Sequence, residues 1–105
     1  MTAKACISPG ICGLQTTVTV QSRGSRFAIA IDSGCRMVRS FAGELADVDP
    51  WSEVWIAGDP PRIWQLAAKH GLHAACPVPV GILKAIEVEA GLALPAHVSI
   101  EISRE

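Results

Sequence analysis

The stretch LQTTVTVQSRGSRFAIAID, residues 14–32, alternates apolar and polar side chains on both sides of a central glycine. Side chains two residues apart face the same side of a β-strand, so this alternation predicts strands over 14–21 and 26–32. The intervening SRGS places Gly24 in a tight turn, where a positive φ is favoured. The stretch therefore predicts an antiparallel β-hairpin with one apolar face.

Apolar residues take a helical spacing after the hairpin. Asp-Pro pairs, which cap and open helices, and glycines, which close them, divide this region into segments. The predicted helices are 33 or 35 to about 47, a short helix capped by Asp49 and opened by Pro50, a third capped by Asp59, opened by Pro60 and closed by Gly71, and 79–90 before Gly91.

The segment HVSIEIS, residues 97–103, alternates again and predicts a third strand with Val98, Ile100 and Ile102 on one face. Strands near both ends of the chain and helices between them indicate an α+β domain. We expect a three-stranded sheet with three to four helices packed on one face, and residues 97–103 beside the first strand of the hairpin. The other face is mild enough to be solvated or to meet a second copy.

The chain is then a single domain over 1–105. Its parts are a cysteine-containing N-terminal segment over 1–13, the hairpin over 14–32, a helical part over 35–91 and the last strand over 97–103. The side chains expected in the core are Val18, Val20, Phe27, Ile29, Ile31, Val98, Ile100 and Ile102 from the strands, with Phe41, Leu45, Leu83 and Ile86 from the helices.

The composition excludes several classes of protein. Half of the 105 residues are hydrophobic and the net charge is −1, so a folded domain with a real core is expected. Basic residues do not cluster, which disfavours a nucleic-acid partner. No apolar run approaches the roughly 20 residues that span a bilayer, and MTAKACISPG has no apolar signal region. We therefore expect a cytosolic protein without a membrane partner.

Four cysteines, Cys6, Cys12, Cys35 and Cys76, stand outside the predicted strands and helices. Cytosolic thiols stay reduced, so four of them point to metal or redox chemistry rather than to disulfides. Cys35 and Cys76 precede predicted helices, where unpaired N–H groups and the helix dipole favour a thiolate, the form that binds metal.

We predict that the four thiolates hold an iron–sulfur cluster or a zinc ion, both of which accept four such ligands. At least three sulfurs should then lie within about 7 Å of one another. The chain lacks the paired C-x-x-C knuckles of many zinc sites, so the signal is the position of the cysteines rather than their spacing. A protein of this kind would be a carrier, an electron-transfer module or a sensor.

Two other functions stay open. Cys76 or Cys35 could be the reactive thiolate of a thiol-dependent redox enzyme. Alternatively, the four thiols are unrelated and the protein is a non-catalytic protein-interaction module. No dinucleotide-binding, P-loop, zinc-protease or serine-hydrolase motif is present, so no catalytic residue is assigned.

Three polar residues are candidates for supporting a thiolate site, each with a plainer alternative. His73 forms a His-x-x-Cys pair with Cys76 but equally suits a helix end. Asp32 precedes Ser-Gly-Cys and suits either a hydrogen bond to that loop or a simple turn. Lys84 would balance the charge of a cluster or form a solvated helix pair with Glu87.

The three tryptophans are the main aromatic feature of a chain without tyrosine. Trp51 and Trp55 are four residues apart and share a helix face, and Trp64 follows in the next helix. We expect them in the core or as a cover over the thiolate site, with an exposed docking patch as the alternative.

The segments CISPGICG, IDSGCRMVRSFAGEL and ACPVPVGILKAIEVEAGLALP resemble a family of small uncharacterised proteins found mainly in anaerobic bacteria and archaea, over nearly the whole chain. That family carries an N-terminal cysteine pair, a cysteine at a strand–helix junction and a Cys-Pro-Val-Pro segment. These positions correspond in this chain to Cys6, Cys12, Cys35, and Cys76 with Pro77. The family has a proline after the junction cysteine, where this chain has Arg36. Its anaerobic distribution favours a cluster over zinc.

A weaker resemblance is to the TSCPD domain of ribonucleotide-reductase-related proteins. SGC before one helix and ACPV before another are similar to that domain's motifs in place and order. This chain lacks the extra cysteine before the last motif, and Val78 stands in place of the aspartate. That domain is suspected of metal binding, so the resemblance implies a metal site by analogy of fold.

Overall fold

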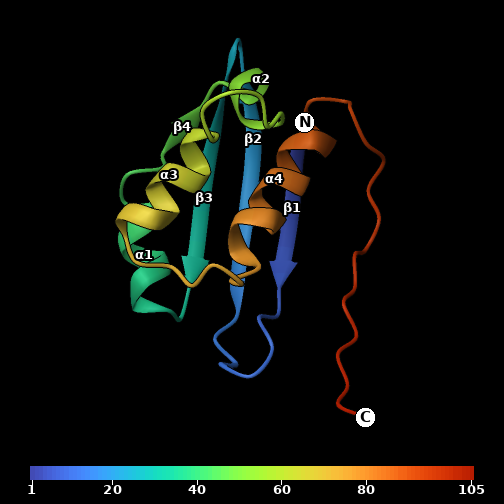
Figure 1. Ribbon diagram of the computed structural model, residues 1–105. Helices are drawn as coiled ribbons and strands as arrows, with labels where there is room; N and C mark the ends of the chain where they lie inside the picture. Colours follow the sequence, from blue (N-terminus) through green and yellow to red (C-terminus); the bar gives the residue numbers. More distant parts are fainter.

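A single antiparallel sheet, with strands in the order β1-β2-β3-β4, organises the chain in the computed structural model, which describes residues 1–105 (Figure 1). The strands are β1 (Thr2–Ile7), β2 (Thr16–Arg23), β3 (Arg26–Ser33) and β4 (Asp47–Val48), and the helices are α1 (Arg36–Ala42), α2 (Pro50–Glu53), α3 (Arg62–Lys69) and α4 (Val78–Glu89). The expected α+β class is confirmed, with four strands in place of three.

The hairpin predicted from the alternating stretch is present as β2 and β3. Arg23 lies opposite Arg26 across the turn, and Gly24 takes a φ of +65°, which side chains other than glycine rarely adopt. The inward residues predicted for the core are buried, except Ile31, which is half-buried. The first strand begins at Thr16, later than predicted, and leaves Leu14 exposed in the connection before it.

Strand β1 was not predicted from the sequence. Its inward residues are Ala3, Ala5 and Ile7, and its outward residues are Thr2, Lys4 and Cys6. Alanine is a weak strand former and adds little apolar contrast, so the alternation is hard to recognise in the sequence. β1 pairs with β2 over its whole length, from Thr2 opposite Gln21 to Ile7 opposite Thr16.

The predicted strand over residues 97–103 is wrong. After α4 the chain runs as an extended tail outside the sheet (Figure 1), and Val98, Ile100 and Ile102 are 61%, 79% and 90% exposed. The place beside the first strand of the hairpin is held by β1, which uses the hydrogen-bonding edge that the tail would have needed. The expectation that these three side chains join the core is therefore wrong as well.

α1 and α3 are shorter than the apolar spacing predicted, whereas α4 (Val78–Glu89) agrees with the predicted 79–90 to within one residue at each end. α1 ends at Ala42, and the chain then turns into β4, which pairs with β3. Asp49 caps α2 as predicted, accepting a hydrogen bond from Trp51 N at 3.1 Å. Asp59 does not cap α3, which begins at Arg62 after Pro61. Gly71 and Gly91 follow the ends of α3 and α4 with φ of +72° and +77°.

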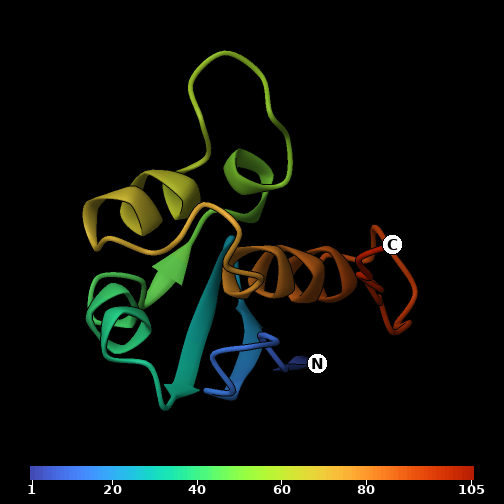
Figure 2. The same ribbon diagram turned by 60° about the horizontal axis from the view of Figure 1, so that its bottom comes forward.

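The core lies between the sheet and the helical layer. Figures 1 and 2 show α3 and α4 on the same side of the strands; α4 packs across β1 and β2, and α1 across β3. Phe41, Leu45, Ile63, Ile82 and Ile86 are completely buried there. None of the helices has the length and apolar character to cross a lipid bilayer.

The opposite side of the sheet, which we call the open face, carries no helix. Its residues are small or polar: Thr2, Lys4, Cys6, Thr17, Thr19, Gln21, Ala28, Ala30 and Asp32. These residues are half-buried or exposed, as predicted for the mild face of the sheet.

Candidate functional site

β1, β2 and β3 start or stop side by side at one end of the sheet. This brings three cysteines to the same end of the molecule. Because neighbouring strands are antiparallel, the end of β1, the start of β2 and the end of β3 lie side by side, with Ile7 opposite Thr16 and Thr16 opposite Ser33. Cys6 is the penultimate residue of β1, Cys12 lies in the connection to β2, and Cys35 follows β3 by two residues.

Cys76 reaches this end through α4. Gly81, in the first turn of α4, lies so close to Ile7 that a β-carbon there would meet Ile7 Cγ1 at 2.6 Å. The start of α4 is thus fixed over the end of β1, and Cys76 precedes the helix by two residues. The lower part of Figure 1 shows the connection before β2, the end of β3 and the start of α4 together. The four cysteines, spread over the whole sequence, therefore share one end of the fold.

The four side chains nevertheless face different ways. Cys6 is exposed on the open face, and Cys12 is exposed in the connection. Cys35 and Cys76 are half-buried and pack against the hydrophobic core. No group of three or more histidine, cysteine, aspartate or glutamate side chains is arranged to hold a metal ion. The chain brings the predicted ligands to one end of the sheet but does not present them as a formed ligand set.

A small buried polar pair positions Cys35. Thr16 Oγ1 and Ser33 Oγ lie 2.7 Å apart across the ends of β2 and β3, and both residues are buried. Ser33 Oγ also accepts a hydrogen bond from Cys35 N at 3.1 Å. The hydroxyl of Ser33 therefore ties the strand end to the residue that precedes α1. The Cys35 side chain makes no capping hydrogen bond to that helix.

Cys76 lies in a compact turn before α4. Its N–H donates to His73 O at 3.0 Å, and Gly81 N donates to Pro77 O at 2.9 Å, which starts the helix. Pro77 lacks an N–H and restricts the backbone at this point. The His73 side chain is exposed. The contact between His73 and Cys76 is therefore the backbone hydrogen bond to His73 O, and the imidazole takes no part in it.

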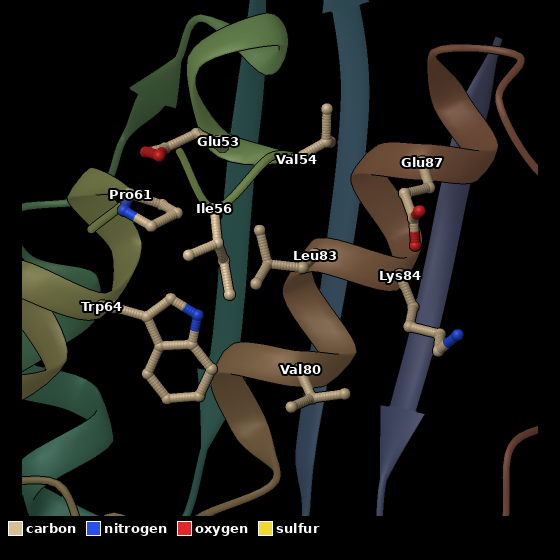
Figure 3. A pocket seen from close by; sticks show the side chains of 9 residues that line it. All are labelled: Glu53, Val54, Ile56, Pro61, Trp64, Val80, Leu83, Lys84 and Glu87. Carbon is tan, nitrogen blue, oxygen red and sulfur yellow. The ribbon is translucent and has the colours of Figure 1, made fainter. Parts of the chain in front are cut away.

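The other two predicted supporting residues lie on different surfaces. Asp32 is exposed on the open face, where Thr17 is its partner on β2 and Cys6 is the partner of Thr17 on β1. Lys84 lines a hollow between α4, α3 and the segment after α2, together with Glu87 (Figure 3). Asp32 thus shares a cross-strand row with Cys6, whereas Lys84 belongs to the wall of a separate pocket.

That pocket has a volume of about 190 Å³ and a mainly apolar wall. Figure 3 shows Ile56, Trp64, Val80 and Leu83 around it. Trp51 and Trp55 lie on the segment beside it, 56% and 63% exposed, and Ile56 is 84% exposed. Of the two expectations for the tryptophans, the exposed patch describes Trp51 and Trp55, whereas Trp64 packs against the core.

Glu53 is a buried carboxylate that the sequence did not reveal. Its carboxylate Oε2 accepts a hydrogen bond from Arg62 N at 2.9 Å, so it satisfies the first turn of α3 in place of the predicted Asp59. Glu53 is 2% exposed. Burial raises the pKa of its carboxyl, and the backbone N–H groups of Arg62 and Ile63 oppose that shift. A cap supplied from a different helix has no signature in local spacing.

Glu53 should make the stability of the protein depend on pH. Its folded pKa is raised above the ordinary value of 4.5, so its contribution is fully present below 4.5 and is lost as pH rises through the folded pKa. Glu53→Gln has no such titration. Urea unfolding at several pH values should therefore show wild type losing stability relative to Glu53→Gln as pH rises from acid to neutral. Curves that stay parallel would contradict the buried-carboxylate assignment; Glu87→Gln, on the pocket wall, is the matched control.

A family model matches residues 3–102 of the chain, nearly its whole length, and is described as a family of unknown function (DUF6951). No curated protein and no solved structure matches the chain significantly. The match includes all four cysteines, all of β1 except Thr2, and most of the chain after α4. The chain belongs to this family of unknown function.

Proposed function

We propose that this protein is a cytosolic metal-binding protein in which the thiolates of Cys6, Cys12, Cys35 and Cys76 hold an iron–sulfur cluster or a zinc ion. A carrier, an electron-transfer module and a sensor all fit a small domain with its ligands at one end. The observation that carries the proposal is the gathering of all four cysteines, from four separate parts of the chain, at one end of the sheet.

The donor chemistry fits such a group. All four cysteines are free thiols, and thiolates are the soft ligands that zinc and iron–sulfur clusters accept. Two of them are exposed, so they are accessible to an incoming metal without opening the core. The TSCPD-like order of SGC and ACPV supports the same assignment by analogy.

The connection between β1 and β2, residues 8–15, has to close around the metal, and the end of β1 has to turn with it so that Cys6 leaves the open face. The connection carries Cys12, and Gly10 and Gly13 hold φ of +91° and +67° within it. Its residues are exposed apart from a half-buried Pro9, so few contacts oppose a rearrangement. Metal binding would order this connection against the start of α4, because formation of a ligand site and local folding are linked.

Cys76→Ser is expected to remove most of the bound metal. Serine keeps the size of the side chain but is a poor ligand for soft metals, and the loss of affinity should exceed the roughly 10- to 100-fold that loss of a supporting group costs. The melting temperature of the metal-loaded protein should fall as well. Metal content and thermal unfolding, measured without oxygen beside wild type and Ala75→Ser, check this.

The metal-free protein provides the other half of the comparison. There Cys76→Ala should cost about 1 kcal/mol, as an ordinary change of a half-buried side chain does. Unchanged metal content in Cys76→Ser would mean that ACPVP serves only to start α4.

A second candidate function, a protein-interaction module, is favoured by the exposed Trp51, Trp55 and Ile56 beside the apolar pocket. Tryptophan is enriched in binding hot spots, where it fills or lines a pocket on the partner. If the protein purified without oxygen contains no metal and has four titratable thiols, this result would favour the interaction module over the metal-binding protein.

A further inference from the structure

The C-terminal tail is a strand without a sheet. Its backbone is extended after Ala93 (Figure 1), and none of residues 93–105 makes a hydrogen bond within the chain. Three β-branched side chains, Val98, Ile100 and Ile102, lie on one side of it and are mostly exposed. An isolated amphipathic strand of this kind gains its stability only by joining a sheet.

Strand β1 offers the matching edge. It is the terminal strand of the sheet, so one row of its backbone N–H and C=O groups has no strand partner. Its inward residues beneath α4 include the small Ala3 and Ala5, so a neighbouring strand with larger apolar side chains meets little bulk along this edge. The strand has no proline that would block pairing along this edge.

An antiparallel register pairs the two segments side chain by side chain. Glu101, the one carboxylate of 97–103, then lies opposite Lys4, the one charge of β1. The same register puts Val98, Ile100 and Ile102 opposite Ile7, Ala5 and Ala3, all on the core side, and Ser99 opposite Cys6 on the open face. Apolar residues therefore meet apolar residues, and opposite charges meet each other, along the whole segment.

The direction of the chain identifies the partner. In Figure 1 the tail runs in the same direction as the β1 of its own chain, so it would pair with that strand in parallel. A second copy related by a two-fold axis perpendicular to the sheet presents β1 in the opposite direction, which gives the antiparallel ladder with its more favourable hydrogen bonds. We infer that the protein forms a dimer in which residues 97–103 of each copy add a strand to the β1 edge of the other.

The start of the tail is suited to this exchange. Leu92, Leu94 and Pro95 line a hollow with Val88 of α4 and with Met1, beside the start of β1. The tail therefore leaves the folded domain next to the edge strand β1. A second copy that pairs at this edge would lie beside the tail. Exchange of identical segments between copies buries the exposed row of both tails in one symmetric interface.

Sedimentation velocity on the purified full chain tests the inference, with a chelator present so that metal does not link the cysteines. Wild type should sediment as a dimer at micromolar concentration. Ile100→Glu should sediment as a monomer and keep the helical circular dichroism signal of wild type, since Ile100 is outside the core. Ser103→Glu, on the other side of the same tail, should remain a dimer. A monomeric wild type, or a dimeric Ile100→Glu, would overturn the inference.

Cross-linking distinguishes exchange from self-pairing. In the antiparallel register Ser99 lies opposite Cys6, whereas a parallel register with Glu101 beside Lys4 brings Ser103 to Cys6. Under mild oxidation Ser99→Cys should therefore form a disulfide with Cys6 that joins two chains, identified by peptide mass spectrometry, and Ser103→Cys should not. A disulfide within one chain from Ser103→Cys would show that the tail pairs with its own β1 and would overturn the exchange.

Discussion

Phe41→Ala is expected to lower the free energy of unfolding by about 3–5 kcal/mol, because Phe41 is the largest side chain that is completely buried. Phe41 belongs to α1, which packs on β3, and its side chain is part of the hydrophobic core. Removal of the ring loses its apolar contacts and leaves a cavity that α1, held between β3 and α3, fills only in part. Urea unfolding at neutral pH measures the change.

Met37→Ala is the matched control, because Met37 is on the same helix and is exposed. It should change stability by no more than about 0.5 kcal/mol, the range of ordinary surface substitutions. Equal losses in both variants would mean that helix propensity, rather than burial of the ring, determines the contribution of α1.

Gly81→Ala is expected to destabilise the protein although alanine is the better helix former. The helix propensity of alanine alone would add about 1 kcal/mol of stability. The new β-carbon would lie 2.6 Å from Ile7 Cγ1, and closer to Cδ1, so the Ile7 side chain must leave its rotamer or α4 and β1 must move apart. Overpacking of this kind costs about 1–3 kcal/mol, and we expect a net loss.

A double-mutant cycle with Ile7→Ala isolates this contact. Ile7→Ala removes both clashing atoms and leaves the Ile7 β-carbon 3.9 Å from the new one, an ordinary contact. Gly81→Ala should therefore stabilise the Ile7→Ala protein while it destabilises wild type, with a coupling of about 0.5–3 kcal/mol. The same sign in both backgrounds would contradict the placement of β1 beneath α4.

The hairpin was predictable from the sequence because strict alternation has a single physical cause, the two faces of a strand with one buried. Val18, Val20, Phe27 and Ile29 are buried as this pattern requires. β1 was missed because Ala3 and Ala5 carry the same alternation with little apolar contrast. The tail has the stronger alternation and yet lies outside the sheet. Alternation shows that a segment can form a strand, but it does not show which strand edge is free to pair with it.

Side-chain roles that depend on contacts between distant segments were the hardest to predict. The cap of α3 comes from Glu53, nine residues before Arg62 in the chain, so the Asp-Pro pattern at Asp59 indicated the wrong cap. Cys35 and Cys76 lie at element junctions as predicted, whereas Cys6 lies within β1 and points to the open face. The sequence indicated the junction positions of Cys35 and Cys76, but neither the place of Cys6 in β1 nor the direction of each sulfur.

Alkylation of the cysteines, counted by mass spectrometry, tests the proposed thiolate site most directly. Cys6 and Cys12 are exposed, so without a metal both should react quickly. In protein purified without oxygen, we predict that all four cysteines are protected while metal is bound. When a chelator or acid releases the metal, all four should become reactive, and the fraction of labelled thiols should rise in proportion to the metal released. Rapid labelling of Cys6 and Cys12 in protein that retains its full metal content would contradict the proposed site. So would protein that contains no metal as purified without oxygen, before any chelator is added, with all four thiols reactive.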